Sequence, residues 1–381
     1  MQIDYIKELF LKHKETRLSN RYITNKNIEP LFNSLSNFVT LKTIGKSVLG
    51  DPIYGLKIGK GGKRILMWSQ MHGNESTTTK ALFDLFNTLL DKDSELKYIL
   101  ETCTLYVIPI LNPDGALAYT RINANKVDLN RDAQDLTQPE SKVLRAVFNS
   151  FNPHFCYNLH GQRTIFSAGT TKNLASVSFL SPAQDKACTI TANRKIAMEV
   201  IGEMNKALQE VIPSQVGVYD DAFNLNCVGD TFQSENVPTI LFEAGHFAND
   251  YEREKTRELI YISYLSSLSY ISKNNIIGDN YKSYLKIPEN DKCFLDVIIR
   301  NAKVGGEVLD IGIQFKEQLI GGKVEFIPKV EKIENLNHLY GHKEIDANGG
   351  EVLNEEGEQL KKGFENIFVI INNKKIMLFS K

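Results

Sequence analysis

The sequence predicts an α/β domain built on a largely parallel sheet, followed by a smaller β-rich region. Three observations predict this fold. Short apolar strands alternate with helices up to about residue 272, a pattern typical of parallel strands joined by crossover helices. The stretch 272–280 is polar and typical of a linker. Beyond it, glycine pairs and alternating apolar residues replace the helical spacing.

The elements expected before residue 272 follow from the spacing of apolar residues. The first is an amphipathic helix from residue 3 to about residue 16. Residues 38–58 predict short strands, interrupted at Gly45 and at the 50–52 turn. A glycine-rich turn at 59–63 leads into a buried strand at 65–68. The remaining expected elements are a helix at 75–90, a strand at 105–111, a helix at 141–151, a strand at 155–159, a helix at 192–211, a strand at 239–242 and a helix from about 251 to 272.

The last hundred residues have a different character. Glycine pairs stand at 305–306, 321–322 and 349–350, as expected for turns between strands. Apolar residues alternate at 297/299, 324/326 and 369/371. We therefore expect a catalytic domain over residues 1–275 and a small β-rich domain of unknown role over residues 281–381.

Composition narrows the classes of function. The 381 residues include 45 Lys and Arg against 46 Asp and Glu, a net charge of −1, which argues against nucleic acid or an anionic membrane as a partner. The five cysteines are scattered and form no CxxC pair, so we expect reduced thiols. No signal-peptide core and no apolar run of about 18 residues is seen, which predicts a cytoplasmic protein. The oligomeric state is left open.

The strongest local motif is the sequence HGNE at 72–75, directly after the strand at 65–68. His72 and Glu75 are three residues apart at a strand-to-helix junction, where both side chains can converge on one zinc ion. Gly73 allows a close approach in the turn between them. This short motif alone is common by chance, and an exposed histidine before a capped helix is the alternative.

His160 is the candidate for a third ligand. It follows the strand at 155–159 and precedes Gly161. The carboxyl ends of strands in an open α/β sheet meet at one edge, where ligands bind, so His160 is expected near His72 and Glu75. Three protein ligands and one open position are typical of a hydrolytic zinc site.

Two further segments are expected at the same edge. The sequence NPDG at 112–115 follows the apolar strand at 105–111, and it is followed by Arg121 and the sequence DLNRD at 128–132. Arginine is suited to carboxylates and to developing oxyanions. Glu243 follows the strand at 239–242, in a position suited to a general base. His246 is either a substrate contact or a structural histidine.

This ordered set of motifs resembles the zinc carboxypeptidase family of metallopeptidases, of the carboxypeptidase A/B type, over roughly residues 40–272. The resemblance implies an α/β/α sandwich around a mixed sheet and one catalytic Zn²⁺. It also implies that His72, Glu75 and His160 are the zinc ligands. Asp128 matches an aspartate that orients a ligand histidine.

The resemblance also implies roles in catalysis and substrate binding. Arg121 matches the arginine that polarises the scissile carbonyl, and Glu243 matches the glutamate that activates water. Asn130 and Arg131 match the pair that holds the terminal carboxylate of the substrate. Tyr219 is a candidate for the family's substrate-capping tyrosine, although its spacing to Glu243 and its aspartate neighbours are unusual. Arg163 is a further positively charged residue near the expected zinc site, and it is not expected from the digestive enzymes of this family.

Two alternatives to a peptidase stay open. Aspartoacylases and succinylglutamate desuccinylases also show HGNE, an arginine followed by DLNR, a strand-end histidine and a glutamate, and they carry a C-terminal β domain. They cleave small N-acyl amino acids, so the substrate is either a peptide or an N-acyl amino acid with a free carboxylate. The other alternative is a catalytically inactive binding protein on the same scaffold. The substrate side chain cannot be deduced from these motifs.

Overall fold

The computed structural model describes residues 1–35 and 39–379, so the predicted strand start at Phe38 lies outside the described residues. The chain forms two compact units. One contains Met1–Gln162 and Ala175–Asn290, and the other contains Arg163–Leu174 and Asp291–Lys381. The domain limits at 275 and 281 stay a prediction. The structure groups residues 163–174 with the β-rich unit, and this grouping was not predicted from the sequence.

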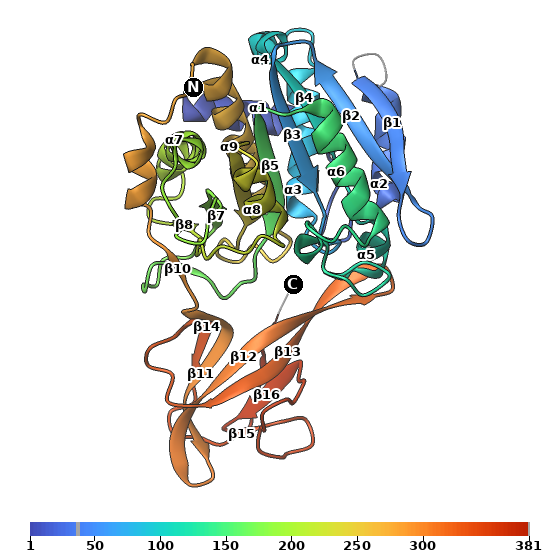
Figure 1. Cartoon of the computed structure of the whole chain (residues 1–381). Helices are drawn as coiled ribbons and strands as arrows, with labels where there is room; N and C mark the ends of the chain where they lie inside the picture. The colour runs from blue at the N-terminus through green and yellow to red at the C-terminus, as the bar shows by residue number, and fades with distance from the viewer. Residues whose placement is uncertain (36–38, 380–381) are drawn as a thin grey trace. The chain divides into compact units, whose positions relative to one another are not determined.

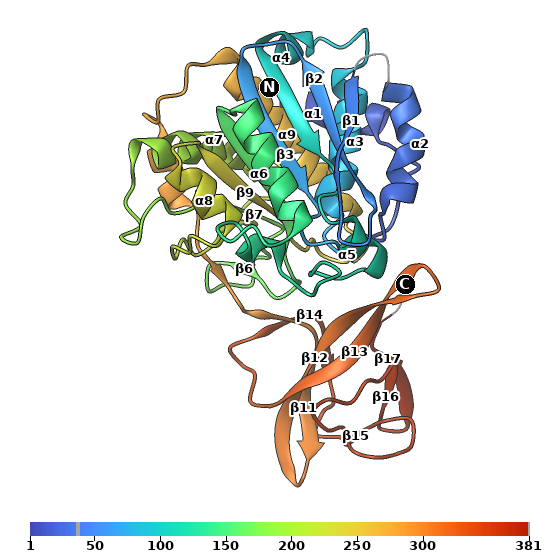
Figure 2. The ribbon, with the colours of Figure 1, turned by 45° about the vertical axis from the view of Figure 1, so that its right-hand side comes forward.

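The larger unit is built on a mixed sheet, seen from two directions in Figures 1 and 2. Within the described residues it has eight strands in the order β1-β2-β4-β3-β5-β9-β7-β8. Neighbours from β4 to β9 run parallel, as do β7 and β8, whereas β1–β2, β2–β4 and β7–β9 are antiparallel. The strands are β1 (Val39–Lys46), β2 (Pro52–Gly59), β3 (Lys63–Ser69), β4 (Cys103–Ile108), β5 (Phe155–Gly161), β7 (Val177–Leu180), β8 (Val216–Val218) and β9 (Thr239–Ala244).

Helices cover both faces of this sheet because its central strands are apolar on both sides. Along β3, Ile65 and Met67 enter one core cluster and Leu66 and Trp68 enter the other, as the alternation of side chains in a strand requires. The first cluster includes α1, α2, α3, α7 and α9, and the second includes α6 and α8 (Figure 2). This arrangement confirms the predicted sandwich.

The five predicted helices of the larger unit are present with shifted ends, as α1, α3, α6, α7 and α9, and the structure adds α2, α4, α5 and α8. They are α1 (Ile3–His13), α2 (Asn25–Leu35), α3 (Thr77–Leu89), α4 (Lys97–Thr102), α5 (Pro113–Ala118), α6 (Pro139–Phe151), α7 (Ala192–Gln209), α8 (Val228–Ser234) and α9 (Glu254–Lys273), with 3-10 turns η1 (Leu129–Arg131) and η2 (Tyr281–Lys286). The NPDG sequence starts α5, where Asn112 caps the helix by accepting from the Gly115 amide at 2.8 Å. Pro113 then occupies the first turn, where it sacrifices no hydrogen bond.

The smaller unit consists of strands, as predicted. Antiparallel β11 (Phe294–Val304), β12 (Glu307–Ile320) and β13 (Lys323–Glu334) form a sheet with β14 (Tyr340–Asp346), which pairs parallel to β11. A second sheet contains β15 (Val352–Leu353), β16 (Phe368–Ile371) and β17 (Lys374–Met377). The short strand β6 (Ser167–Ala168) pairs with β10 (Asn290–Asp291), which spans the boundary of the two units in the sequence. An apolar core that includes Val297, Ile313 and Val369 holds the sheets together.

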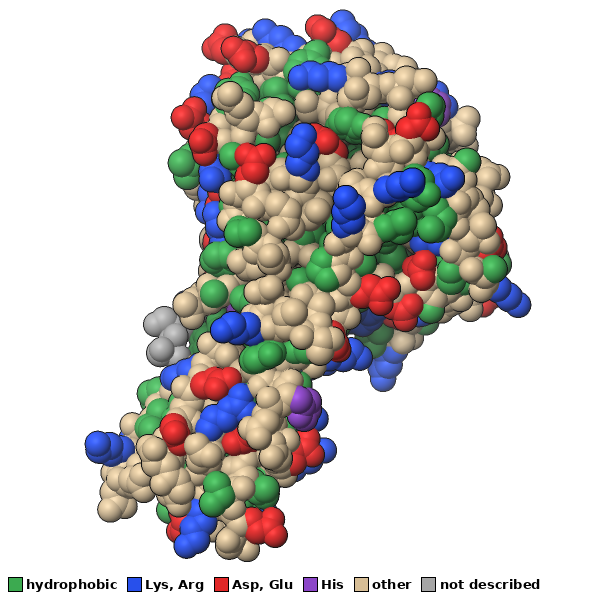
Figure 3. Space-filling model, turned by 90° about the vertical axis from the view of Figure 1, so that its left-hand side faces the viewer, with side chains coloured by type: hydrophobic (Ala, Val, Ile, Leu, Met, Phe, Trp, Pro, Cys, Tyr) green, Lys and Arg blue, Asp and Glu red, His purple; other side chains and the backbone are tan. Residues whose placement is uncertain are grey.

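Charged side chains of both signs are interspersed over the face shown in Figure 3. This mixture agrees with the near-zero net charge of −1. No helix among residues 1–35 and 39–379 is both long and apolar enough to span a membrane.

Candidate metal centre

The candidate site lies at the carboxyl ends of three adjacent parallel strands. His72 and Glu75 stand in the turn between β3 and α3, His160 is the sixth residue of β5, and Glu243 is the fifth residue of β9. His160 and Glu243 are direct neighbours in the β5–β9 register. Gly73 fits the turn because a Cβ there would come within 2.0 Å of the Gly115 carbonyl carbon. The sheet topology thus places these side chains at one edge.

Three potential ligand groups converge there. The Nδ1 atom of His72 lies 2.9 Å from Oε1 of Glu75, and Nδ1 of His160 lies 2.9 Å from Oε2 of the same carboxylate. Nδ1 of His160 is also 3.1 Å from Nδ1 of His72. Both imidazoles are almost fully buried, and Glu75 accepts a further hydrogen bond from the Gly161 amide at 3.0 Å. The structure therefore brings together the three residues that the sequence analysis named as ligands.

These groups fit a bound metal ion. Two neutral imidazoles whose nitrogens face each other at 3.1 Å need a proton or a shared cation between their lone pairs. Two nitrogens and one carboxylate are the donor set of many catalytic zinc sites. Burial acts to raise the pKa of Glu75, but His72 and the hydrogen bonds from both histidines hold that pKa well below its usual range. The carboxylate is thus ionised, as a metal ligand must be.

Asp128 connects the ligands to the next segment of the site. One of its oxygens lies 3.0 Å from Nε2 of His72, and the other accepts from Nε of Arg121 at 3.0 Å. The same carboxylate caps η1 by accepting from the Asn130 amide at 2.9 Å. Burial opposes ionisation of Asp128, but these partners hold its pKa below its usual range. The bond to Nε2 leaves Nδ1 of His72 to face the ligand cluster.

Asn130 and Arg131 lie on η1, beside the first turn of α8. The side-chain oxygen of Asn130 accepts from the Val228 amide at 3.1 Å, which ties η1 to α8. Arg131 is exposed and donates to the Asn130 carbonyl at 2.8 Å. Its positive charge acts to lower the pKa of the Cys227 thiol, although burial keeps that pKa raised. The exposed guanidinium retains further donors for a bound anion.

Glu243 has a different environment from the ligand carboxylate. Burial, and then the negative charge of Glu75, raise the pKa of Glu243 well above its usual range. Arg121 and Arg253 act in the opposite direction, as a divalent cation at the ligand cluster would also do. The Oε2 atom of Glu243 is buried and has no hydrogen-bond partner among the described residues.

The remaining candidates differ in their location. Burial, and then the negative charges of Glu243 and Glu75, raise the pKa of the Tyr219 phenol. Its predicted capping role stays a prediction. Arg163 is exposed and is the first residue of the smaller unit, so its predicted role stays a prediction. His246 is buried and its ring contacts that of Tyr251 at 4.7 Å between centroids, in keeping with a structural histidine.

Sequence reasoning overlooked Arg253. This arginine is buried at the start of α9 and donates to main-chain carbonyls of β9 and of the residue after β5. The only sequence signal is a basic residue before an apolar helix, which ordinarily predicts a solvated side chain.

Comparison with known proteins finds similarity to carboxypeptidases. The family model described as zinc carboxypeptidase matches residues 25–222. Carboxypeptidase SOL1 of Arabidopsis thaliana is 31% identical over 182 residues, which are 41% of this chain and 37% of that protein. Carboxypeptidase M of Mus musculus is 27% identical over 180 residues, 39% of this chain and 41% of that protein. The chain thus spans less than half the length of either relative.

Solved structures show the same fold. Carboxypeptidase A from Helicoverpa armigera aligns with a TM-score of 0.51 at 16% identity, over 70% of this chain and 80% of that one. A metallo-carboxypeptidase from Burkholderia cenocepacia aligns with a TM-score of 0.52 at 15% identity, over 65% of this chain and 70% of that one. These similarities support the fold of the larger unit.

Proposed function

Because the chain belongs to the zinc carboxypeptidase family, we propose that it is a metallocarboxypeptidase that removes a C-terminal residue from a peptide, with one zinc ion as cofactor. The observation that carries this proposal is the convergence of His72, Glu75 and His160 next to the carboxylate of Glu243, whose Oε2 atom is buried. A ligand cluster without a neighbouring base would fit a structural metal site equally well. The combination fits hydrolysis.

In this proposal Nδ1 of His72, the Glu75 carboxylate and Nδ1 of His160 hold the zinc ion. When bound, zinc supplies Lewis-acid chemistry, because it polarises a carbonyl and acidifies water. Asp128 keeps the His72 ring oriented through its bond to Nε2. The bond from the Gly161 amide fixes the Glu75 oxygen that faces His160.

Glu243 moves the proton. As a base it takes a proton from the attacking water, and it then returns that proton to the leaving nitrogen. One water is consumed, the C–N bond breaks, and the products are a carboxylic acid and an amine. Arg121 donates to the carbonyl oxygen as negative charge develops there; its bond to Asp128 and its 3.7 Å approach to Glu75 hold it beside the ligands.

Arg131 and Asn130 bind the free carboxylate of the substrate. A bidentate arginine–carboxylate contact is strong and specific in direction, and the exposed guanidinium of Arg131 suits that role. Tyr219 closes over the bound residue in this proposal.

A substrate panel tests the proposal. Zinc-loaded protein is assayed on peptides that vary at the C-terminal residue, on their C-terminal amides, and on N-acetyl and N-succinyl amino acids. Release of single amino acids from free-acid peptides supports a carboxypeptidase, whereas turnover of the N-acyl amino acids alone would assign a deacylase. Metal binding without any turnover would identify an inactive binding protein.

Metal analysis tests the ligand assignment. His72→Ala removes one of three ligands, so zinc content after dialysis is expected to fall from about one ion per chain to near zero. His154→Ala is the matched control, because His154 is exposed and bonds to Arg64. Undiminished zinc in His72→Ala would contradict the assignment.

A further inference from the structure

Arg253 is one of the largest fully buried side chains in the larger unit. It precedes α9 with a left-handed backbone, φ 60° and ψ 29°. A non-glycine residue in this region costs about 1 kcal/mol or more. Burying a guanidinium is costly unless its donors find acceptors. Arg253 combines an unfavourable backbone conformation with a buried charge, which indicates that its side chain has a specific structural role.

The guanidinium bridges the ends of two strands. Nη1 donates to the Ala244 carbonyl at 3.2 Å, and Nη2 donates to the Gln162 carbonyl at 3.1 Å. The Gln162 amide itself donates to the Ala244 carbonyl at 3.0 Å. The arginine therefore extends the β5–β9 pairing beyond its last ladder bond, as a side-chain crosslink between the two main chains.

The bridged residues adjoin the candidate site. Gln162 is two residues after His160, and Ala244 is the residue after Glu243. His160 and Glu243 pair directly in the register. The planar fork of arginine holds two acceptors at a fixed spacing, which lysine does not do. Arg253 therefore contacts both main chains within two residues of His160 and Glu243.

We propose that Arg253 is a positioning residue that fixes His160 relative to Glu243 by crosslinking β5 and β9. This inference rests on the proposed function for its effect on catalysis, and on the geometry alone for its effect on the ligand. A small misplacement of a general base lowers the rate strongly without weakening substrate binding.

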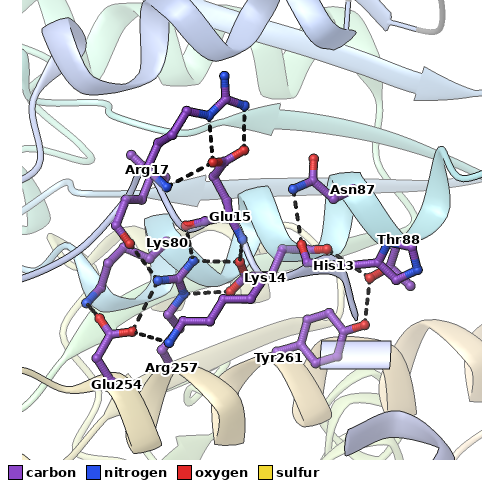
Figure 4. Close-up of polar contacts among 12 residues, drawn as sticks. His13, Lys14, Glu15, Arg17, Lys80, Asn87, Thr88, Glu254, Arg257 and Tyr261 are labelled. Carbon is purple, nitrogen blue, oxygen red and sulfur yellow. Dashed lines mark hydrogen bonds and ion pairs between the residues drawn. The ribbon is translucent and has the colours of Figure 1, made fainter. Parts of the chain in front are cut away.

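Arg257 supplies a matched control, shown in Figure 4. It is also fully buried, lies four residues further along, and donates to main-chain carbonyls, those of Glu15 and Leu18. It also pairs with the buried Asp84 at 2.6 Å. Arg257→Met thus removes a comparable buried cation that contacts the N-terminal segment.

The experiment compares Arg253→Met, Arg253→Lys and Arg257→Met at a temperature where all are folded. For Arg253→Met we expect kcat to fall about 10- to 100-fold with KM within about threefold. We expect its zinc affinity to fall about 3- to 10-fold, less than for a group bonded to the ligand itself. Arg257→Met is expected to lower stability while kcat and zinc affinity stay within about twofold of wild type.

Several outcomes would overturn the proposal. One is that Arg253→Met and Arg257→Met change kcat and zinc affinity equally. Another is that Arg253→Lys, which keeps the positive charge but loses the two parallel donors of the guanidinium, has the kcat and zinc affinity of wild type. If Arg253→Met does not fold, Arg253→Lys alone tests the proposal. If wild type hydrolyses no substrate, the proposed function fails, and the zinc affinities still decide whether Arg253 positions His160.

Discussion

The carboxylate of Asp128 binds three groups that come from different parts of the site. They are the ligand His72, the side chain of Arg121 and the amide of Asn130. The resemblance of DLNR to the family motif predicted that Asp128 orients the histidine. The bonds of Asp128 to the Asn130 amide and to Arg121 depend on the conformation of the segment between β4 and α6, which the motif does not determine. Residue types and order were predictable from the sequence, and these shared partners were not.

At the same scale, Glu243→Gln tests the proposed base. Glutamine keeps the size of the side chain but cannot take a proton from water. General acid–base groups typically contribute about 100- to 10,000-fold, so kcat is expected to fall by at least the lower figure while zinc content is unchanged. Glu235→Gln is the control, since Glu235 pairs with Arg145 at 2.7 Å and is exposed. Near-normal turnover by Glu243→Gln would point to another base.

The proposed carboxylate site calls for a comparison of substrates. Arg131→Ala is expected to raise KM for free-acid peptides by about 10- to 100-fold, because a charge-assisted bidentate contact is worth about 1.5–3 kcal/mol. C-terminal amides make no such contact, so their slow turnover should change little. Arg145→Ala provides the control on a half-buried arginine of α6 that pairs with Glu235. An equal loss for acids and amides would remove Arg131 from this role.

At the scale of elements, the strand ends were the predictable part. Continuous apolar runs gave β3, β5 and β9 to within a few residues, and the parallel topology then brought His72, His160 and Glu243 together. Six elements of the larger unit were not predicted: α2, which contains Pro30 in its interior, the six-residue helices α4 and α5, and β7, β8 and α8. The last three, β7, β8 and α8, have four, three and seven residues, too few to show a period. The place of β7 is set by its pairing with β9, and that of β8 by its pairing with β7.

A charged cluster between α3 and α9 predicts how stability depends on pH (Figure 4). Lys80 is fully buried and pairs with Glu254 at 2.5 Å. Burial lowers the pKa of Lys80 to about 8, although Glu254 opposes the shift. For Glu254, burial is outweighed by Lys80 and Lys14, and its pKa falls to about 2.

The sign of the acid effect follows from the lowered pKa of Glu254. Its contribution is fully present above the ordinary value of 4.5 and is lost as pH falls toward 2. Allowing for its partial exposure, we expect about 1–2 kcal/mol to be lost across this window. Denaturant unfolding at pH 5 and pH 3 measures it. Glu254→Gln should show a smaller drop than wild type, and Glu258→Gln, which alters a Lys255 pair, should keep the wild-type drop.

The dependence of stability on alkaline pH comes from Lys80, whose pKa is lowered in the folded chain. Between pH 8 and 10.5 the unfolded chain holds a proton on this lysine that the folded chain has released, so the contribution of Lys80 to stability rises with pH across that window. Lys80→Met should flatten this rise when unfolding is measured at pH 8 and pH 10. A rise of equal size in wild type and Lys80→Met would show that other groups cause it.

At the scale of the whole molecule, the two units share the chain in an unexpected way. Segment 163–174 leaves the larger unit directly after the strand that carries His160, and its partners lie in the smaller unit. Thr164 binds Gln314 through its hydroxyl at 2.8 Å and His342 through its carbonyl at 2.8 Å. The Ile165 carbonyl accepts from the Phe294 amide at 3.1 Å. Twelve residues without a clear period gave no sequence signal for this grouping.

A truncation after Asn290 tests the consequence. It removes Gln314, His342 and Phe294, so segment 163–174 loses the hydrogen bonds that hold it. The backbone groups and apolar side chains of the segment then become exposed to solvent. A protease cleaves such a segment at a rate proportional to the fraction of molecules in which the segment is locally unfolded. We expect chymotrypsin to cleave after Phe166 at least about tenfold faster in the truncated chain than in the full chain, since losing even 1.4 kcal/mol of local stability raises the open fraction tenfold.

Lys316→Ala in the full chain, which removes only an exposed pair with Glu365, should leave the rate unchanged. If the truncated chain resisted cleavage as well as the full chain, the segment would be held by the larger unit alone, and the β-rich unit would be dispensable for the loop that follows His160.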